Sequence, residues 1–450
     1  MERKLIFNAT VVSQGNPDFV IEDGAVLVEG SRIAAVGTSR DLCGKHPDAQ
    51  QINANGAVLM PGLVNAHHHL YSTFACGLGC DPAFNFPEIL RKLWWKLDRA
   101  LSMQDVYFSA MVPLHRCIRA GTTTIIDHHA SPYAVEGSLS TLAAAAQAAG
   151  VRASFCYEVS DRDGTESLEA GLAENARFAA QAAATPGNLV RGMFGLHASM
   201  TVSESTVARA VETARQLGIG IHVHAAEDVS DQEDSLKKYG KRVVRRFADA
   251  GALGPKTILA HCIHVDDEEK QLLKDSGTFV VHNPESNMNN AVGAADVLGM
   301  LKMGVRVGLG TDGMTSNMLD EARVAMLLHR HVKHDPTVAF GEAVDMLVRN
   351  NARFASEQFG VKLGVIEPGA AADLVIVAHY PFTPISTANW YGHFLFGIQP
   401  SAVTHTMVDG KWLMFDGKVQ TLDLPFIAQH TRKLSPETWK RFGSMPEHKA

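Results

Sequence analysis

The chain has 450 residues, of which 46% are hydrophobic and 20% charged, with 38 Gly and 18 Pro; this globular composition excludes a disordered or fibrous protein. At roughly 150 residues per domain the length allows about three units, or one barrel of about 200–250 residues with an accessory domain. The 41 basic and 48 acidic residues give a net charge of −7 without a long basic run, so we expect no nucleic-acid partner.

Six Cys are too few for a disulfide scaffold, which indicates a reduced compartment. The opening residues MERKLIFNATVVSQG contain no apolar signal-peptide core, and no run of eighteen apolar residues occurs. These patterns predict a cytoplasmic protein without a membrane partner. We therefore expect it to act on a small molecule, and as a homo-oligomer, namely a dimer.

The two ends of the chain have the same local pattern. Residues 1–58 are predicted to form short strands joined by turns, and so are residues 366–420. Each β segment is too small to bury a core alone, so we predict that they join into one β-sandwich. Its second part, 366–450, includes a C-terminal tail that is helical in part over 423–441 and has no assigned function.

The middle of the chain, residues 59–365, alternates short apolar runs with amphipathic stretches. The runs lie at 58–69, 122–129, 152–158, 189–197, 218–227, 257–261, 278–283 and 305–312. Eight strands with helical crossovers predict an α/β fold, a (β/α)8 TIM-like barrel. The runs end mostly in His, Glu, Asn or Asp, and the C-terminal face of such barrels carries the chemistry.

Three His-x-His patterns occur, and their predicted secondary structure separates them. On a strand, residues two apart project to the same face and can bind one ion, whereas on a helix they point about 200° apart. His67 and His69 end the first barrel strand, so we predict that they bind a metal. His329 and His331 continue an amphipathic helical pattern, and we expect them at a solvated helix end.

The third pattern, His222 and His224, ends the fifth strand, and Glu227 follows it closely. A carboxylate near a metal-activated water can act as a proton shuttle, although an acid at a helix N-terminus would explain Glu227 as well. His261 and Asp312 end the sixth and eighth strands, where each alone could be a structural group. Together, imidazoles and a carboxylate from four strand ends match the open ligand set of a catalytic metal.

Five motifs, in this order, resemble the amidohydrolase superfamily, in its cytosine deaminase-like or atrazine/triazine hydrolase branch. They are PGLVNAHHH at 61–69, HAAE at 224–227, AHC at 260–262, HNPESN at 282–287 and GLGTDG at 308–313. Two further segments, LWWKLDRAL at 93–101 and IDHHASP at 126–132, are most similar to SsnA-type aminohydrolases. The resemblance covers nearly the whole chain.

The resemblance implies a metal-dependent hydrolytic deaminase of an amino-substituted N-heterocycle, such as a purine, a pterin or a related base, that uses one metal-activated water. The implied ligands of one divalent metal, Zn²⁺ or alternatively Fe²⁺, are His67, His69, His224 and Asp312. The implied catalytic groups are Asp312 as acceptor of the water proton, Glu227 as proton donor to the ring nitrogen, and His261 as a hydrogen-bonding group.

Two alternatives and two exclusions accompany this interpretation. A triazine-type hydrolase would remove chloride or an alkylamine, but Glu227 favours an amine, which must be protonated to leave; a non-catalytic scaffold would need a lost ligand. Relatives with two metals use a carbamylated Lys, and this chain has no Lys between Lys96 and Lys237, so we predict one metal. The absence of a Pro-Cys-x-x-Cys motif excludes the unrelated zinc deaminases that act on nucleic-acid bases.

The substrate is less well determined by the sequence. The resemblance implies that His197 contacts substrate, and His129, Glu158 and Trp95 are further candidates, although structural hydrogen bonds or core packing explain them equally. Asn289 and Asn290 stand where the family often has a Lys, and Cys76-Gly77 stands in place of the Arg-Gly of nucleoside deaminases. These differences argue against adenosine-like substrates.

Overall fold

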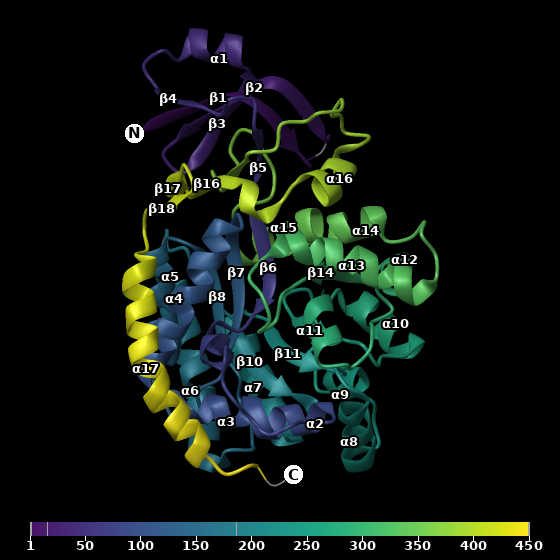
Figure 1. The fold of residues 1–450 in the computed structure, drawn as a ribbon. Helices are drawn as coiled ribbons and strands as arrows, with labels where there is room; N and C mark the ends of the chain where they lie inside the picture. The colour runs from purple at the N-terminus through teal and green to yellow at the C-terminus, as the bar shows by residue number, and fades with distance from the viewer. Residues whose placement is uncertain (1, 16, 186, 449–450) are drawn as a thin grey trace.

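The central part of the computed structural model, which describes residues 2–15, 17–185 and 187–448, is a ring of parallel strands surrounded by helices (Figure 1). The strands are β6 (Leu63–His68), β7 (Thr122–His129), β8 (Arg152–Tyr157), β9 (Val190–Gly192), β10 (Phe194–Ala198), β11 (Ile221–Ala225), β12 (Ile258–His261), β13 (Phe279–His282) and β14 (Arg306–Leu309). β6 to β9 form one sheet and β10 to β14 another. Bridges between Val159 and Leu196, and between His68 and Asp312, join the two sheets into a closed barrel. The predicted α/β barrel is thus confirmed, with β9 and β10 sharing its fourth strand position.

Helices cover the outside of the barrel. They include α4 (Met103–Arg119), α5 (Ser138–Ala149), α6 (Gly164–Ala183), α7 (Glu204–Leu217), α8 (Val229–Tyr239), α9 (Val243–Asp249), α10 (Asp267–Ser276), α11 (Pro284–Asn289), α12 (Val297–Met303), α13 (Met318–Lys333), α14 (Phe340–Asp345) and α15 (Ala352–Phe359). Local sequence sets their ends. In α7, for example, the Ser203 side chain accepts the Thr206 N–H, and Gly218 ends the helix with φ of 66°, a conformation that glycine adopts readily.

The two ends of the chain meet in a second sheet. It contains β1 (Arg3–Ser13), β2 (Phe19–Glu29), β3 (Arg32–Thr38), β4 (Gln50–Asn53), β5 (Val58–Pro61), β15 (Leu374–Val377), β16 (Val403–Val408), β17 (Lys411–Phe415) and β18 (Lys418–Val419). β5 pairs with β1 on one side and with β15 on the other, so strands from both termini build one nine-stranded sheet. The predicted joining of the terminal segments is therefore observed.

Gly62 separates the two parts of the first predicted run, residues 58–69. β5 belongs to the terminal sheet and β6 to the barrel. A Cβ at Gly62 would lie 2.2 Å from the Thr123 methyl group, so only glycine allows the chain to pass this closely over β7.

His329, which was predicted to lie at a solvated helix end, is buried. His329 is 1% exposed and its ring centroid is 5.1 Å from that of His282, so the prediction of a solvated position was wrong for His329. It shares the inward face of α13 with Ala325 and Met326, one turn apart. His331 is exposed, as expected.

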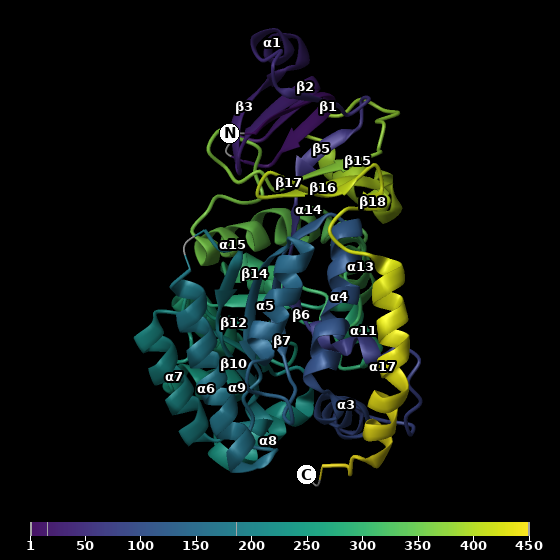
Figure 2. The same cartoon turned by 90° about the vertical axis from the view of Figure 1, so that its left-hand side faces the viewer.

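The last helix, α17 (Leu424–Ser444), runs along the barrel from the terminal sheet toward α3 (Trp95–Ala100) (Figures 1 and 2). Thr438 Oγ1 donates a hydrogen bond of 2.8 Å to the buried Asp105 Oδ1 on α4. The short helices α2 (Phe86–Ile89) and η2 (Leu90–Trp94) precede α3. None of the helices within the described ranges is long and apolar enough to cross a membrane.

Candidate metal centre

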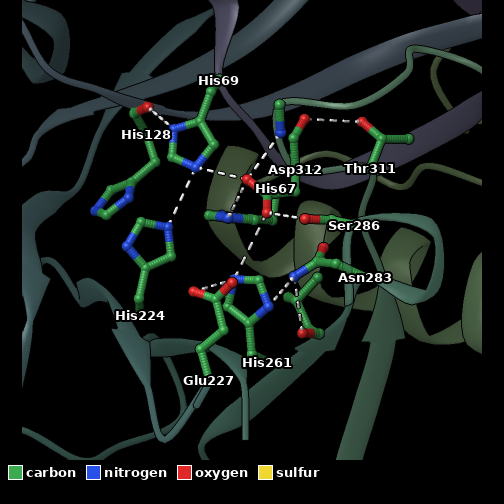
Figure 3. Close-up of polar contacts among 12 residues, drawn as sticks. His67, His69, His128, His224, Glu227, His261, Asn283, Ser286, Thr311 and Asp312 are labelled. Carbon is green, nitrogen blue, oxygen red and sulfur yellow. Dashed lines mark hydrogen bonds and ion pairs between the residues drawn. The ribbon is translucent and has the colours of Figure 1, made fainter. Parts of the chain in front are cut away.

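Four barrel strand ends deliver imidazoles and a carboxylate to one point (Figure 3). His67 lies on β6 and His69 just after it, His224 on β11, His261 at the end of β12, and Asp312 after β14. The four imidazoles are buried, and the Asp312 side chain is 13% exposed. The structure therefore brings together all four predicted metal ligands.

The backbone at three of these strand ends is in an unfavourable conformation. Ala226, His261 and Asp312 have φ of 50°, 75° and 53°, a region that residues other than glycine seldom occupy. Such conformations cost about 1–3 kcal/mol each and concentrate at functional sites. Here they turn Glu227, His261 and Asp312 toward the barrel axis.

Backbone carbonyls fix which ring nitrogens of His69 and His224 carry a proton. His69 Nδ1 lies 2.6 Å from the carbonyl oxygen of His128, and His224 Nδ1 lies 2.9 Å from that of His197. A carbonyl only accepts, so both Nδ1 atoms donate and both Nε2 atoms are left as ligand atoms. This is the arrangement by which proteins orient metal-binding histidines.

The Nε2 atoms and a carboxylate oxygen then face each other. His69 Nε2 is 3.2 Å from His224 Nε2 and 2.9 Å from Asp312 Oδ1. His67 Nε2 is 3.7 Å from the same oxygen and has no hydrogen-bond partner among the described residues. Three imidazole nitrogens and one carboxylate oxygen around one point fit a divalent metal ion.

His222, the other member of the third His pair, orients the predicted ligand His67. Its Nε2 lies 2.9 Å from His67 Nδ1, which leaves His67 Nε2 directed at the centre. His128, which is also close to His67 and His224, bonds through Nε2 to the carbonyl oxygen of His222 at 3.1 Å. These two buried histidines help to hold the predicted ligands in place.

Glu227 and His261 lie beside the four predicted ligands. His261 Nδ1 is 2.8 Å from Asn287 Oδ1, so His261 donates there, and its Nε2 faces Glu227 Oε2 at 3.5 Å and Asp312 Oδ2 at 3.8 Å. Burial and the nearby charge of Asp312 raise the pKa of Glu227 well above its ordinary value. A protonated Glu227 is able to act as an acid.

The pKa of Asp312 is shifted in the opposite direction. Burial alone would raise its pKa, but His67 and His69 outweigh burial and hold the pKa well below its ordinary value. Ser286 Oγ donates to Asp312 Oδ2 at 2.6 Å, and the Gly313 N–H donates to Oδ1 at 2.8 Å. Two carboxyl groups in one site thus have pKa values shifted in opposite directions, as is typical of acid–base pairs.

A cavity opens over these residues, and three predicted candidates for substrate contact, Trp95, Glu158 and His197, line it. His129 is not brought to its wall: His129 Nε2 bonds to Ser131 Oγ at 2.9 Å. Successive strand residues point to opposite faces, and on β7 the inward position belongs to His128.

Three charged residues of the cavity wall, Asp98, Arg162 and Asp231, were missed by the sequence interpretation. Asp98 and Arg162 line the cavity and form an ion pair with each other. Arg162 follows Glu158 closely in the run Ser-Asp-Arg-Asp after the third strand, and this charged run at a strand end was the available signal. Asp98 stands in a helical segment, where nothing local distinguishes it from a surface acid.

Known proteins resemble this chain over nearly its full length. Residues 58–413 match the Amidohydrolase family, and residues 24–49 match an imidazolonepropionase-like composite domain of bacteria. A 5′-deoxyadenosine deaminase of Methanosarcina mazei is 32% identical over 98% of this chain and 99% of its own. A 5-methylthioadenosine/S-adenosylhomocysteine deaminase of Moorella thermoacetica is 34% identical over 96% and 99%.

Solved structures share the same fold. An adenosine deaminase of Xanthomonas campestris with bound zinc superimposes with a TM-score of 0.86 at 26% identity, covering 98% of this chain and 99% of its own. A triazine hydrolase from Arthrobacter aurescens gives 0.82 at 23% identity, over 97% and 100%. The second similarity concerns the fold alone.

Proposed function

Because the chain belongs to the amidohydrolase family, and is a metal-dependent hydrolytic deaminase of an amino-substituted N-heterocycle, we propose that its substrate is an aminopurine. Adenine nucleosides modified at the 5′ position are the first class to test. The observation that carries the reaction is the meeting of the His67, His69 and His224 nitrogens with Asp312, next to a Glu227 whose pKa is raised.

We assign His67, His69, His224 and Asp312 as ligands of one divalent ion. The bound zinc of the adenosine deaminase relative supports Zn²⁺, with Fe²⁺ as the alternative that imidazole ligands also suit. Such an ion lowers the pKa of a water molecule toward about 7 and so supplies the nucleophile. The lack of Lys between Lys96 and Lys237 supports a single ion.

The residues around the ion divide the proton transfers. Asp312 accepts the proton that the attacking water loses. Glu227 donates a proton to the ring nitrogen next to the amino-bearing carbon, and regains one from the new hydroxyl group as the carbonyl forms. The proton taken up by Asp312 passes to the amino group, which leaves as ammonia. His261 donates through Nδ1 to Asn287, so its Nε2 accepts a hydrogen bond from the attacking water and orients it. The net reaction replaces the ring amino group by oxygen and releases ammonia.

The cavity wall opposite the ion would bind the heterocycle. His197 Nδ1 lies 2.7 Å from Thr201 Oγ1, which in turn donates to the Ala198 carbonyl at 3.1 Å, so His197 donates to Thr201 and its Nε2 is an acceptor. Glu158 adds a second acceptor and Arg162 a donor. The edge of a purine ring carries both hydrogen-bond donors and hydrogen-bond acceptors.

The relatives and the sequence differences indicate different substrates. The curated relatives are named for 5′-modified adenosines. Asn289 and Asn290, in place of a Lys that the family often has, and the Cys76-Gly77 pair, in place of the Arg-Gly of nucleoside deaminases, argue against adenosine-like substrates. Asn290 lies on the cavity wall, and its Nδ2 is 3.5 Å from Glu227 Oε1. Full-length similarity outweighs these single positions, which is why 5′-modified adenosines are tested first.

The test is ammonia release from a substrate panel by the zinc-loaded protein. The panel contains 5′-deoxyadenosine, 5′-methylthioadenosine, S-adenosylhomocysteine, adenosine, adenine, guanine, a pterin and a chlorotriazine, with the Glu227→Gln variant as control for contaminating deaminases. We expect ammonia from at least one aminopurine. Chloride release from the triazine without ammonia from any purine would contradict the proposal, and so would inactivity toward the whole panel.

A further inference from the structure

We propose that residues 445–448, here called the tail segment, position the substrate-binding wall of the cavity. His448 holds Asp163, and Asp163 holds Arg162 on that wall. His448 is thus a positioning residue that acts through two others. The effect on substrate binding rests on the proposed function, whereas the effect on the wall itself does not.

The tail segment makes three contacts with residues that belong to the substrate-binding wall or adjoin it. The Arg99 guanidinium donates to the Pro446 carbonyl oxygen at 2.7 Å. His448 Nε2 lies 3.1 Å from Asp163 Oδ1. The His448 ring stands edge-on against Trp95, with 5.8 Å between centroids. These contacts connect the end of the described chain to residues more than 280 positions earlier.

From Asp163 the contacts continue into the cavity. Asp163 Oδ2 accepts the Arg162 Nε–H at 3.0 Å, and Arg162 also pairs with Asp98. The guanidinium lies 5.2 Å over the Trp95 ring, and its Nη1 is 3.5 Å from His197 Nε2. The side chains of Asp98, Arg162 and Asp163 are at most 7% exposed, so their relative positions matter energetically.

Helix α17 delivers the tail segment to this place. Trp439 Nε1 donates to the Phe74 carbonyl at 2.9 Å, and Arg441 Nε donates to the Ala100 carbonyl at 2.6 Å. The Phe442 side chain is buried under Lys96, whose Nζ lies 4.7 Å from the ring centroid. The helix is therefore fixed to the same α3 region that carries Trp95 and Asp98.

The wall and the metal cluster are held by different parts of the fold. Trp95 and Asp98 come from α3, and Arg162 and Asp163 from the segment after β8. The two segments contact each other directly, through Arg162 with Asp98 and Trp95, and the tail segment contacts both of them from a third side. The predicted metal ligands are instead fixed by barrel strands. Loss of His448 should therefore loosen the wall and leave the cluster intact. A shift of about 1 Å in a binding group can cost up to about 10²-fold in rate.

The experiment compares His448→Ala, His448→Gln and a chain ended after Ser444 with a control, Glu447→Ala, which alters an exposed neighbour. With 5′-deoxyadenosine as probe we expect KM to rise about tenfold in His448→Ala and in the shortened chain, with kcat within about twofold. His448→Gln should keep most of the wild-type KM, because its amide can donate to Asp163. Zinc content should be unchanged in all four.

A second readout needs no substrate. Hydrogen exchange measured by mass spectrometry should become faster in peptides covering 92–99 and 160–164 of His448→Ala, and stay unchanged in those covering His67 and His224. If 5′-deoxyadenosine is not deaminated, the proposed function fails on that substrate and exchange alone decides. Unchanged exchange in 92–99 and 160–164, or an unchanged KM in His448→Ala, would overturn the proposal; the point variant decides if the shortened chain does not fold.

Discussion

His69 Nε2 and His224 Nε2 face each other at 3.2 Å, while the Nδ1 atom of each ring donates to a backbone carbonyl. Two ring nitrogens this close require a positive charge between them. A proton can supply it: burial alone would lower the pKa of His69, but Asp312 and Glu158 raise it well above its ordinary value. A divalent cation would supply it better, because the His67 Nε2 and Asp312 Oδ1 atoms lie where they could bind the same ion.

Removal of the metal should therefore abolish activity and lower stability together. Dialysis against a chelator should remove ammonia release and lower Tm, since an ion bound by the native state but weakly by the unfolded chain stabilises it. Adding Zn²⁺ or Fe²⁺ should restore both. A sample dialysed against buffer is the control. Full activity at well under one metal equivalent per chain would contradict the account.

His222→Ala should weaken metal binding although His222 is not assigned as a ligand. The substitution removes the partner 2.9 Å from His67 Nδ1, and loss of such outer partners typically costs about 10–100-fold in metal affinity or activity. Competition with a metal-sensitive dye measures the affinity. His331→Ala on the exposed end of α13 is the matched control, and an affinity for His222→Ala equal to that of this control would argue against the supporting role.

Activity should fall as the pH rises through the pKa of Glu227. The pKa is raised by burial and by Asp312, and an acid donates only while protonated, so kcat is retained below this pKa and lost above it. The descending limb should therefore lie above the ordinary pKa of a glutamic acid. A pH–kcat profile at saturating zinc checks this. A profile that rises through the same range would assign Glu227 as a base.

The barrel and the terminal sheet are joined by a buried ion pair. Arg152 on β8 donates twice to Asp373, at 3.1 Å each, and Asp373 also accepts the Asp409 N–H at 2.8 Å. Asp373→Ala leaves the buried guanidinium with only the more distant Asp409 carboxylate, at 3.7 Å, and we expect a loss of up to about 3–5 kcal/mol in unfolding free energy.

Denaturant unfolding with a second variant tests the origin of that loss. Arg152→Met combined with Asp373→Ala removes both charges and should recover part of the stability. The exposed pair of Arg209 and Glu169 offers a control, whose disruption should cost at most about 1 kcal/mol. If the double variant loses as much unfolding free energy as the two single variants together, or more, charge pairing is not the cause.

Strand-end chemistry made much of the site predictable. His67, His69, His224 and Asp312 each follow a short apolar run, and parallel strands of one barrel place such residues on one face. The left-handed backbone at His261 and Asp312 was not predictable, because no local pattern marks it.

Long-range contacts account for what the sequence did not reveal. Arg162 and Asp98 are neighbours only because β8 and α3 are brought together, and His448 joins them from the far end of the chain. His329 was misplaced because a helical pattern alone does not tell which polar residue lies on the inward face. Residues 58–61 were counted with the barrel because an apolar run does not show which sheet it joins.

The most direct test separates the two carboxylates by metal content. Glu227→Gln should keep about one metal per chain while kcat falls by roughly 10²–10⁴, the usual contribution of a positioned acid or base. Asp312→Asn should lose metal as well as activity, because a ligand must be deprotonated to bind. Metal analysis of both proteins after identical purification decides the matter: metal lost from Glu227→Gln and fully kept in Asp312→Asn would reverse the assigned roles and contradict the one-metal account.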